Sequence, residues 1–218
     1  HASMAQLNEE SQLVAVVDND TSLKEELEKE FKIPFFESLE ELFESEIEID
    51  VVNVCTPNHL HAKQAIVALK NGCHAVVEKP MALTKVDAEQ LIHESLKVNK
   101  RIFIVMQNRY SPPSKWLKEL VINNTLGDIY MVNINCFWNR DHDYYQGGAE
   151  TYWKGKLEQD GGTLFTQFSH FLDTMYWLFG DIKNIKASFY DFNHQHTTEF
   201  EDSGIVQFDF VNGGAGSL

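Results

Sequence analysis

Two short apolar runs in the first half of the chain, residues 51–55 and 75–77, each end in side chains that can do chemistry. The first run leads into Thr56, Pro57, Asn58 and His61, and the second into Glu78 and Lys79. Pro80 disfavours a helical backbone at Lys79, so the ammonium group should leave the strand end at a defined angle. Such a cation can hydrogen-bond a substrate hydroxyl and stabilise negative charge developing on its oxygen. Lys79 is therefore a candidate catalytic residue, with Glu78 to position it.

His170 is the second candidate catalytic residue, in a segment that opens with Gly161 and Gly162. On one helix, at about 100° per residue, one stripe would be apolar and another side polar. The apolar stripe would hold Leu164, Phe168, Phe171, Leu172, Met175, Leu178 and Phe179, and the polar side Thr163, Thr166, Gln167 and His170. A histidine, with its ordinary pKa near 6.5, suits a general base. We expect Asp173 to orient its ring and the two glycines to admit an anionic substrate to the helix N-terminus; the alternative is a capping or surface histidine.

The elements that must position these residues alternate between strand and helix as far as residue 108. Apolar runs at 13–17, 51–55, 75–77 and 102–106 have the character of buried strands, and segments 22–31, 38–44, 59–70 and 84–98 have helical patterns. Thr84 and Asp87 form a near capping box, Asn58 is a candidate cap and Gly72 a stop signal. The order predicts an α/β fold with a Rossmann-like doubly wound parallel sheet.

Beyond Ser111-Pro112-Pro113, a turn and helix start, the pattern changes to period-two alternation. One face of segment 129–138 would carry Tyr130, Val132, Ile134, Cys136 and Trp138, and segment 205–211 alternates Val206, Phe208 and Phe210 with polar residues. We predict a dinucleotide-binding domain at 1–108 and an α+β domain with a largely antiparallel sheet at 109–218. The apolar face around Val132 predicts a homodimer or homotetramer interface.

Three blocks together resemble the Gfo/Idh/MocA family of NAD(P)-dependent sugar and polyol oxidoreductases. They are Thr56-Pro57-Asn58-x-x-His61, Glu78-Lys79-Pro80, and the glycine-rich segment 161–173 that contains His170. The resemblance implies that Lys79 and His170 are catalytic. It also implies a cofactor site formed by Asp18, Thr56, Pro57, Asn58, His61, Glu78, Lys79 and Trp153.

Asp18 ends the first apolar run, where a carboxylate can accept both hydroxyls of the adenosine ribose. Its charge would repel the extra phosphate of NADP, so NAD is the expected cofactor; the alternative is a helix-capping aspartate. A glycine turn normally lies about 20 residues before this acid, and none is present. We expect the first strand and its glycine loop to precede residue 1, and a strand returning from the turn at 212–216 to follow Leu218.

Aromatic and basic stretches at 137–140, 144–145 and 152–155 resemble the branch that acts on UDP-N-acetylhexosamines at C3. The substrate-binding residues implied are Arg109, Arg140, Lys154, Thr166 and Gln167. Thr166 stands where inositol dehydrogenases of the family carry aspartate. We therefore expect oxidation of a ring hydroxyl of a sugar or nucleotide sugar. The alternatives are a free-sugar or inositol dehydrogenase and a non-catalytic regulatory protein that binds NAD(H) or a sugar.

The composition excludes several other classes of function. The 218 residues carry a formal net charge of -15, which disfavours binding to nucleic acids or anionic membranes. Cys55, Cys73 and Cys136 are distant from one another and read as reduced core residues of a cytoplasmic protein. The pairs His59/His61 and His194/His196 lack recognisable further ligands, so no metal site is expected.

Overall fold

The computed structural model describes residues 1–147 and 152–218, which divide into two compact units. The first unit comprises His1–Thr56 and Leu60–Ile104, and the second comprises Pro57–His59 and Val105–Leu218. The short segment Pro57–His59 therefore belongs to the second unit, although the residues on both sides of it belong to the first.

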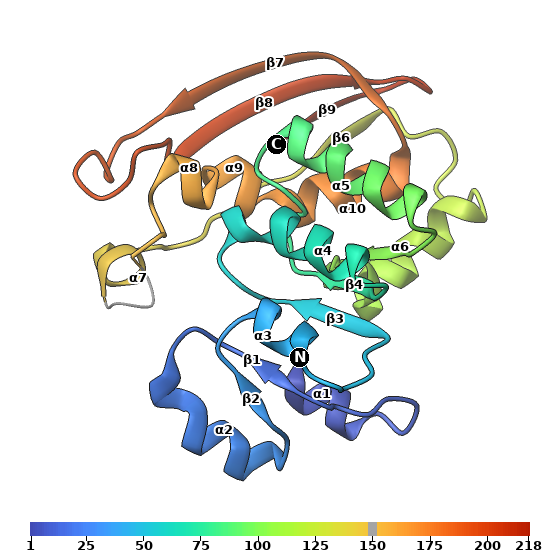
Figure 1. Ribbon diagram of the computed structural model, residues 1–218. Coiled ribbons are helices and arrows are strands. Elements are labelled where there is room, and N and C mark those ends of the chain that lie inside the picture. The colour runs from blue at the N-terminus through green and yellow to red at the C-terminus, as the bar shows by residue number, and fades with distance from the viewer. Residues whose placement is uncertain (148–151) are drawn as a thin grey trace. The chain divides into compact units, whose positions relative to one another are not determined.

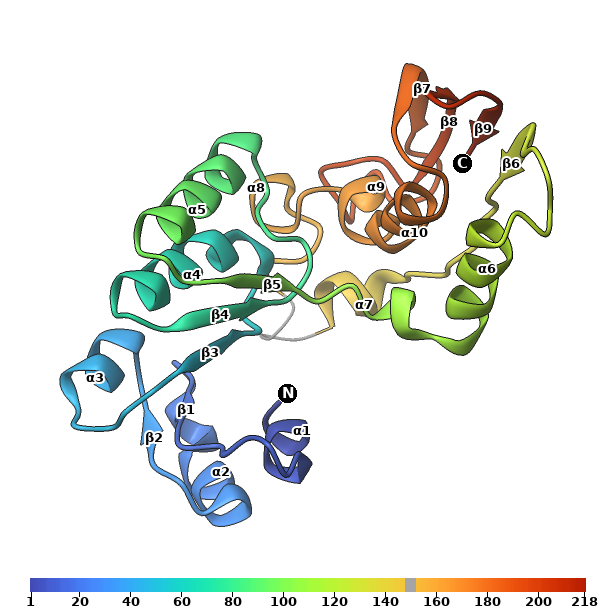
Figure 2. The same cartoon turned by 90° about the vertical axis from the view of Figure 1, so that its right-hand side faces the viewer.

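Parallel strands form the centre of the first unit. Strand β1 (Val16–Val17) pairs with β2 (Phe35–Phe36), and a three-stranded sheet has the order β3 (Val51–Val54), β4 (His74–Val77), β5 (Ile102–Ile104). Helices α4 (His61–Lys70) and α5 (Lys85–Lys97) lie on the same face of the three-stranded sheet (Figure 2). The other helices are α1 (Ala2–Leu7), α2 (Lys24–Phe31) and α3 (Leu39–Glu44), with 3-10 turns η1 (Thr21–Leu23) and η2 (Asn58–Leu60). The predicted Rossmann-like parallel arrangement is confirmed.

The core of this unit is made of small and branched side chains from α4, α5 and β4. Ala65, Leu69, Ala75, Val77 and Leu91 are completely buried in it. Small residues such as alanine let a helix approach its sheet closely, and the dense contact that results stabilises the core.

The predicted helix signals in this unit are only partly correct. Thr84 caps α5 as expected, because its side chain accepts the backbone N–H of Asp87 at 3.1 Å. Gly72 follows the end of α4 with a φ of 81°, in the left-handed region that favours glycine. Asn58 does not cap α4: the residue at that position is Leu60, and it makes no side-chain hydrogen bond.

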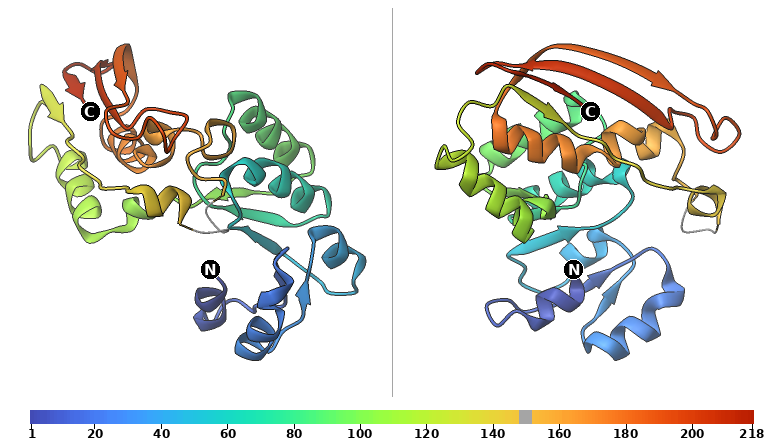
Figure 3. Two further views of the ribbon diagram at one scale, coloured as in Figure 1. Left: turned by 90° about the vertical axis from the view of Figure 1, so that its left-hand side faces the viewer. Right: turned by 180° about the vertical axis from the view of Figure 1, so that it is seen from behind.

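A four-stranded mixed sheet dominates the second unit. Its order is β6 (Met131–Asn133), β9 (Ala215–Ser217), β8 (Ser203–Phe210), β7 (Ile182–Tyr190), with only the β6–β9 pair parallel. The sheet arches over helix α10 (Ser169–Phe179), as Figures 1 and 3 show. The remaining elements are η3 (Gln107–Tyr110), α6 (Pro112–Ile122), α7 (His142–Gln146), α8 (Leu157–Asp160) and α9 (Thr163–Thr166). The prediction of a largely antiparallel sheet is confirmed.

Side chains from β8 and α10 form the core of this unit. Val206, Phe208 and Phe210 alternate inward as predicted and pack with Met175 of α10. Gly216 lies beneath one of these rings, since a Cβ atom there would approach Phe208 to 2.3 Å. Only glycine fits at that point of β9.

Several expectations about the second unit need correction. The strand that returns from the turn at 212–216 does not follow Leu218: it is β9, which begins at Ala215. Segment 129–138 forms ladder pairs only at Met131–Asn133. Val132 and Ile134 are partly buried against the unit's own core, whereas Tyr130 is exposed, and the subunit interface expected on this face stays a prediction. Segment 161–173 is divided between α9 and α10, with Gln167 and Phe168 between them.

The three cysteines differ in burial. Cys73 is buried but Cys55 is exposed, which corrects the expectation that all three are core residues.

In the part of the chain that the structure describes, no helix has both the length and the apolar character needed to span a bilayer.

Candidate active site

Polar side chains follow three parallel strands of the first unit. Asp18 comes directly after β1, Thr56 lies two residues after β3, and Glu78 and Lys79 follow β4. Val54 pairs with Val77 across the ladder, and the backbone N–H of Glu78 donates to the carbonyl of Val54 at 2.9 Å. Thr56 and Lys79 therefore leave the same edge of one sheet, the edge at which open α/β sheets bind ligands.

His61 joins these two strand ends. It is 1% exposed, and its Nε2 lies 2.7 Å from the carbonyl oxygen of Thr56 while its Nδ1 lies 2.7 Å from that of Pro80. The Thr56 hydroxyl donates to Gln64 Oε1 at 2.6 Å. The predicted cofactor residues Thr56 and His61 are thus brought together, and their hydrogen bonds hold the loops on both sides of Lys79.

Glu78 makes local contacts beside Lys79. Its Oε2 accepts the backbone N–H of Lys79 at 3.2 Å, and its Oε1 lies 2.9 Å from Nε2 of His1. The peptide bond between Lys79 and Pro80 is cis. Glu78 therefore contacts the backbone of Lys79, as expected for a residue that positions it.

Asp18 is half-buried and does not cap the helical turn that follows it. The cap is Asp20, whose Oδ1 accepts from the backbone N–H of Ser22 at 2.9 Å and from its hydroxyl at 2.5 Å. The side-chain hydrogen bond from Ser22 lowers the pKa of Asp20. The Asp18 carboxylate accepts the backbone N–H of Asp20 at 2.9 Å and so closes a local turn.

His170 lies in the first turn of α10, in the second unit, and is 7% exposed. The side-chain nitrogen of Gln107 lies 3.5 Å from its Nε2. Gln107 was not among the site residues predicted from the sequence. Its position after β5 was an available signal, because it follows the next strand of the series that leads to Thr56 and Lys79.

Arg109 and Asp173 contact each other rather than the partners expected for them. Nε of Arg109 donates to Oδ2 of Asp173 at 2.6 Å, and its terminal nitrogen donates to Oδ1 at 2.5 Å. The hydrogen bond to Asp173 raises the pKa of Arg109. Both oxygens of Asp173 are thus used by Arg109, which corrects the expectation that Asp173 orients His170, and Asp173 already balances the charge of the arginine.

A cluster of side chains surrounds the ring of Tyr144, and we call it the cation cluster: Arg140, Tyr144, Lys154 and Gln167. The guanidinium carbon of Arg140 lies 4.3 Å from the ring centroid, and Nζ of Lys154 lies 4.4 Å from it. Gln167 accepts from Arg140 at 3.4 Å and donates to the Tyr144 hydroxyl at 3.1 Å. Two like charges beside one ring attract the ring face but repel each other, and an anionic ligand relieves that repulsion.

The structure brings Arg140, Lys154 and Gln167 together, but it gives Thr166 a different setting. Thr166 is 2% exposed, and its hydroxyl donates to the carbonyl of Gly162 at 2.8 Å, one turn earlier. Trp153 is half-buried in the turn before α8. The expectation that Gly161 and Gly162 admit an anionic substrate to the helix N-terminus also changes. The Glu201 carboxylate accepts the N–H of Leu164 at 3.2 Å and so occupies the place expected for the anion.

Asn58 uses its side chain for a structural contact in the second unit. Its amide donates to the carbonyl of Asp160 at 2.9 Å and to the Asp160 carboxylate at 3.3 Å, and both residues are buried. The carboxylate also accepts the N–H of Gly155 at 3.0 Å. These bonds attach Asn58 to the segment that carries Lys154.

Comparisons with known proteins agree with this arrangement. The family model described as "Oxidoreductase family, NAD-binding Rossmann fold" matches residues 1–106, and the "GFO/IDH/MocA C-terminal domain" matches residues 115–218. The chain belongs to the Gfo/Idh/MocA oxidoreductase family. Its first unit has the family's NAD-binding Rossmann fold, and its second has the fold of the family's C-terminal domain.

Individual members of the family are similar over nearly the whole chain. The WlbA dehydrogenase from Bordetella pertussis, solved with NADH and UDP-GlcNAcA, has a TM-score of 0.92 at 30% identity; the match covers 100% of this chain and 62% of that one. D-glucoside 3-dehydrogenase from Escherichia coli K12 is 28% identical over 98% of this chain and 64% of its own. The scyllo-inositol 2-dehydrogenase (NADP(+)) IolW from Bacillus subtilis is 27% identical over 86% of this chain and 50% of its own. The chain thus spans less than two thirds of the length of each of these relatives.

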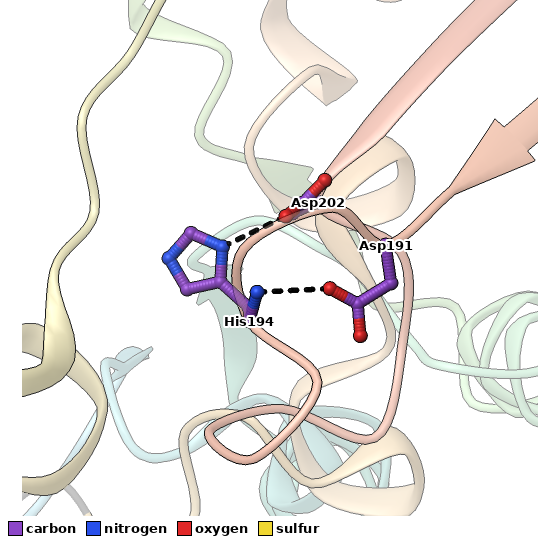
Figure 4. A group of neighbouring side chains, drawn as sticks. All are labelled: Asp191, His194 and Asp202. Atoms are coloured by element: carbon purple, nitrogen blue, oxygen red, sulfur yellow. Dashed lines mark hydrogen bonds and ion pairs between the residues drawn. The ribbon is translucent and has the colours of Figure 1, made fainter.

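One further group in this Gfo/Idh/MocA chain has the composition of a metal site: Asp191, His194 and Asp202 (Figure 4). Nδ1 of His194 donates to Asp202 at 3.0 Å, its backbone N–H donates to Asp191 at 2.9 Å, and its Nε2 donates to the carbonyl of Arg140 at 2.6 Å. Both ring nitrogens are therefore engaged, and a metal ion would have to displace one of these hydrogen bonds. The geometry assigns the group to internal hydrogen bonding.

Proposed function

We propose that the protein is an NAD-dependent dehydrogenase that oxidises a ring hydroxyl, at C3, of a UDP-linked N-acetylated sugar or its uronic acid. The observation that carries the proposal is the cation cluster, where Arg140 and Lys154 lie against one aromatic ring. A pyrophosphate or uronate carries the negative charge that such a pair attracts, and an aromatic ring can stack on a sugar or base. The similar WlbA enzyme was solved with a ligand of this class, UDP-GlcNAcA.

The cofactor proposal depends on the strand ends of the first unit. Asp18 supplies a half-buried carboxylate after β1, suited to two ribose hydroxyls and unfavourable to the extra phosphate of NADP. Thr56 and Pro57 follow β3, and Glu78 and Lys79 follow β4, so polar groups and backbone are available along one sheet edge. NAD, when bound, would accept the hydride.

Within this proposal, Lys79 and His170 act on the same substrate hydroxyl. The imidazole of His170 takes the hydroxyl proton as general base. The ammonium of Lys79 hydrogen-bonds the same oxygen and stabilises its negative charge while the carbon loses hydride and becomes a carbonyl. Glu78 and His61 hold the backbone on either side of Lys79, and Gln107 contacts the His170 ring.

A dehydrogenase of free sugars or inositols is the second candidate, and the similarity to the Escherichia coli and Bacillus subtilis enzymes favours it. Thr166 argues against the inositol branch, because its hydroxyl is neutral and bonds to the carbonyl of Gly162. Arg140 and Lys154 would have no anionic partner on an uncharged sugar.

A substrate panel tests these two functions directly. The protein is incubated with NAD and, separately, with UDP-sugars, UDP-uronates, glucosides and inositols, and reduced nicotinamide is followed by absorbance. The proposal predicts that UDP-linked substrates give the highest kcat/KM. Faster turnover of glucosides or inositols would establish the second candidate, and NAD binding without any turnover would indicate a regulatory protein.

The cellular setting is also part of the proposal. We propose a cytoplasmic enzyme, supported by three cysteines that form no disulfide among the described residues. A homodimer or homotetramer is proposed from the family resemblance.

A further inference from the structure

His194 connects a loop of the second unit to Arg140, one of the two cations of the cation cluster. Its Nδ1 lies 3.0 Å from Oδ2 of Asp202, and its Nε2 lies 2.6 Å from the carbonyl oxygen of Arg140. A carbonyl oxygen and an ionised carboxylate only accept hydrogen bonds, so both bonds form only when both ring nitrogens carry a proton. The geometry requires the imidazolium form.

The surroundings of the ring favour that form. The titratable or charged groups that face His194 are Asp191 and Asp202 of its own loop, Arg140, and Tyr145 of α7, whose ring centroid is 5.7 Å away. Burial would lower the pKa of His194, but the hydrogen bonds to Asp202 and Arg140 and the charges of Asp202 and Asp191 outweigh it and raise the pKa.

Asp202 and Tyr145 keep charge states that fit the imidazolium. Burial would raise the pKa of Asp202, but hydrogen bonds from the Asn193 and Phe192 backbone, His194 and Ser203 outweigh it and lower that pKa well below its usual range. Burial, followed by the charge of Asp160, raises the pKa of Tyr145 to about 12, so its ring stays neutral. The anionic Asp202 and the neutral ring of Tyr145 thus lie against the imidazolium.

We propose that His194, as an imidazolium, is a positioning residue that fixes Arg140 for anion binding in the cation cluster. The role rests on the proposed function, since the anion is the diphosphate or carboxylate of the UDP-sugar. A neutral ring keeps only one N–H, and the ionised Asp202 is a stronger acceptor than a carbonyl. Loss of a proton therefore releases the carbonyl of Arg140, and the guanidinium is no longer held against Tyr144.

The protonation state can be measured without a ligand, by NMR of protein with ¹⁵N-labelled histidine rings. His194, assigned by loss of its signals in His194→Gln, is expected to keep two protonated ring nitrogens to a higher pH than an unstructured histidine peptide in the same buffer, whose pKa is about 6.5. A His194 ring that becomes neutral at or below the pH at which the peptide does would overturn the proposal.

The positioning role is tested by the Kd for UDP as a function of pH, measured by calorimetry. Wild-type affinity should fall as pH rises through the raised His194 pKa. At a pH at which the wild-type His194 ring is protonated, His194→Gln should bind about tenfold more weakly, since one hydrogen bond to a charged group contributes at least about 1.4 kcal/mol. The matched control His196→Gln should stay within twofold.

Asp202→Asn separates positioning from a general structural defect. The asparagine keeps the size of the side chain and an acceptor oxygen but removes the charge, so the pH midpoint of UDP binding should move down while low-pH affinity is retained. An unchanged midpoint, or weak binding at every pH, would contradict the role of His194. Wild-type protein that binds no UDP at any pH would instead overturn the proposed substrate and with it this role, while the NMR result on the ring is decided separately.

Discussion

Arg109 and Asp173 form a two-pronged ion pair in which each carboxylate oxygen accepts from a different guanidinium nitrogen, at 2.6 and 2.5 Å. The pair joins η3, which carries Gln107, to α10, which carries His170. It therefore fixes the helix that presents the candidate base against the segment that contacts its ring.

Removing this pair should destabilise the second unit. We expect Asp173→Ala to lower the free energy of unfolding by about 2 kcal/mol, because a bidentate, charge-assisted pair is lost and Arg109 is left partly buried. Urea denaturation measures the change. The control is Glu89→Ala, which removes the exposed pair with Lys85 and should cost about 0.5 kcal/mol or less. An equal loss in the free energy of unfolding for the two variants would show that the Arg109–Asp173 pair stabilises the fold no more than an exposed ion pair does.

Gly162 should tolerate alanine less well than Gly213, although both have similar positive φ values of 100° and 104°. Alanine at either position should cost about 1–3 kcal/mol through backbone strain. At Gly162 the new Cβ atom also lies 3.3 Å from Oε1 of Glu201, whereas nothing lies within 4 Å at Gly213. Displacing Glu201 weakens its hydrogen bond to the Leu164 N–H, which should lower the free energy of unfolding by about 1 kcal/mol more. Thermal denaturation that ranks Gly213→Ala as the less stable variant would contradict this explanation.

Gln107 should contribute to turnover through the ring of His170. We expect Gln107→Leu to lower kcat by about fivefold, since it removes one hydrogen bond of about 1 kcal/mol to the imidazole. Steady-state kinetics with the best substrate of the panel measures the effect. Gln90→Leu, at an exposed position of α5, is the matched control and should leave kcat unchanged. If the two variants were indistinguishable, the contact with His170 would have no catalytic importance.

The cation cluster should determine affinity for the charged part of the substrate. Arg140→Ala and Lys154→Ala should each raise KM for a UDP-sugar by about tenfold. Each variant loses one charge-assisted hydrogen bond to the anion, which contributes at least about 1.4 kcal/mol. Neither should change KM for an uncharged glucoside. Lys186→Ala removes an exposed lysine of β7 and serves as the control. Equal losses for charged and uncharged substrates would show that the cluster does not recognise the anion.

Sequence pattern predicted the elements well because periodicity reports which face of an element is apolar. Val206, Phe208 and Phe210 were expected to face inward, and they are buried. The Thr84 cap was also predictable, because a cap depends on residues only three positions apart.

Polar contacts between distant residues were not predictable in this way. The pairing of Arg109 with Asp173, and of Glu201 with the N–H of Leu164, depends on which loops meet in space, and no local pattern records that. Both contacts involve groups that were expected to serve the substrate or His170. Gln107 is an intermediate case, since its place after β5 was visible and was not used.

The central claim is that Lys79 and His170 act on one substrate hydroxyl, and a double-mutant cycle on kcat tests it most directly. Each single variant, Lys79→Ala and His170→Ala, should lower kcat by about 10²–10⁴-fold, whereas Lys85→Ala, at an exposed lysine, should not. Groups that act as a unit are strongly non-additive. The account predicts that the double variant is about as slow as the slower single variant. Single variants within about threefold of wild type, or two large effects that simply multiply, would contradict it.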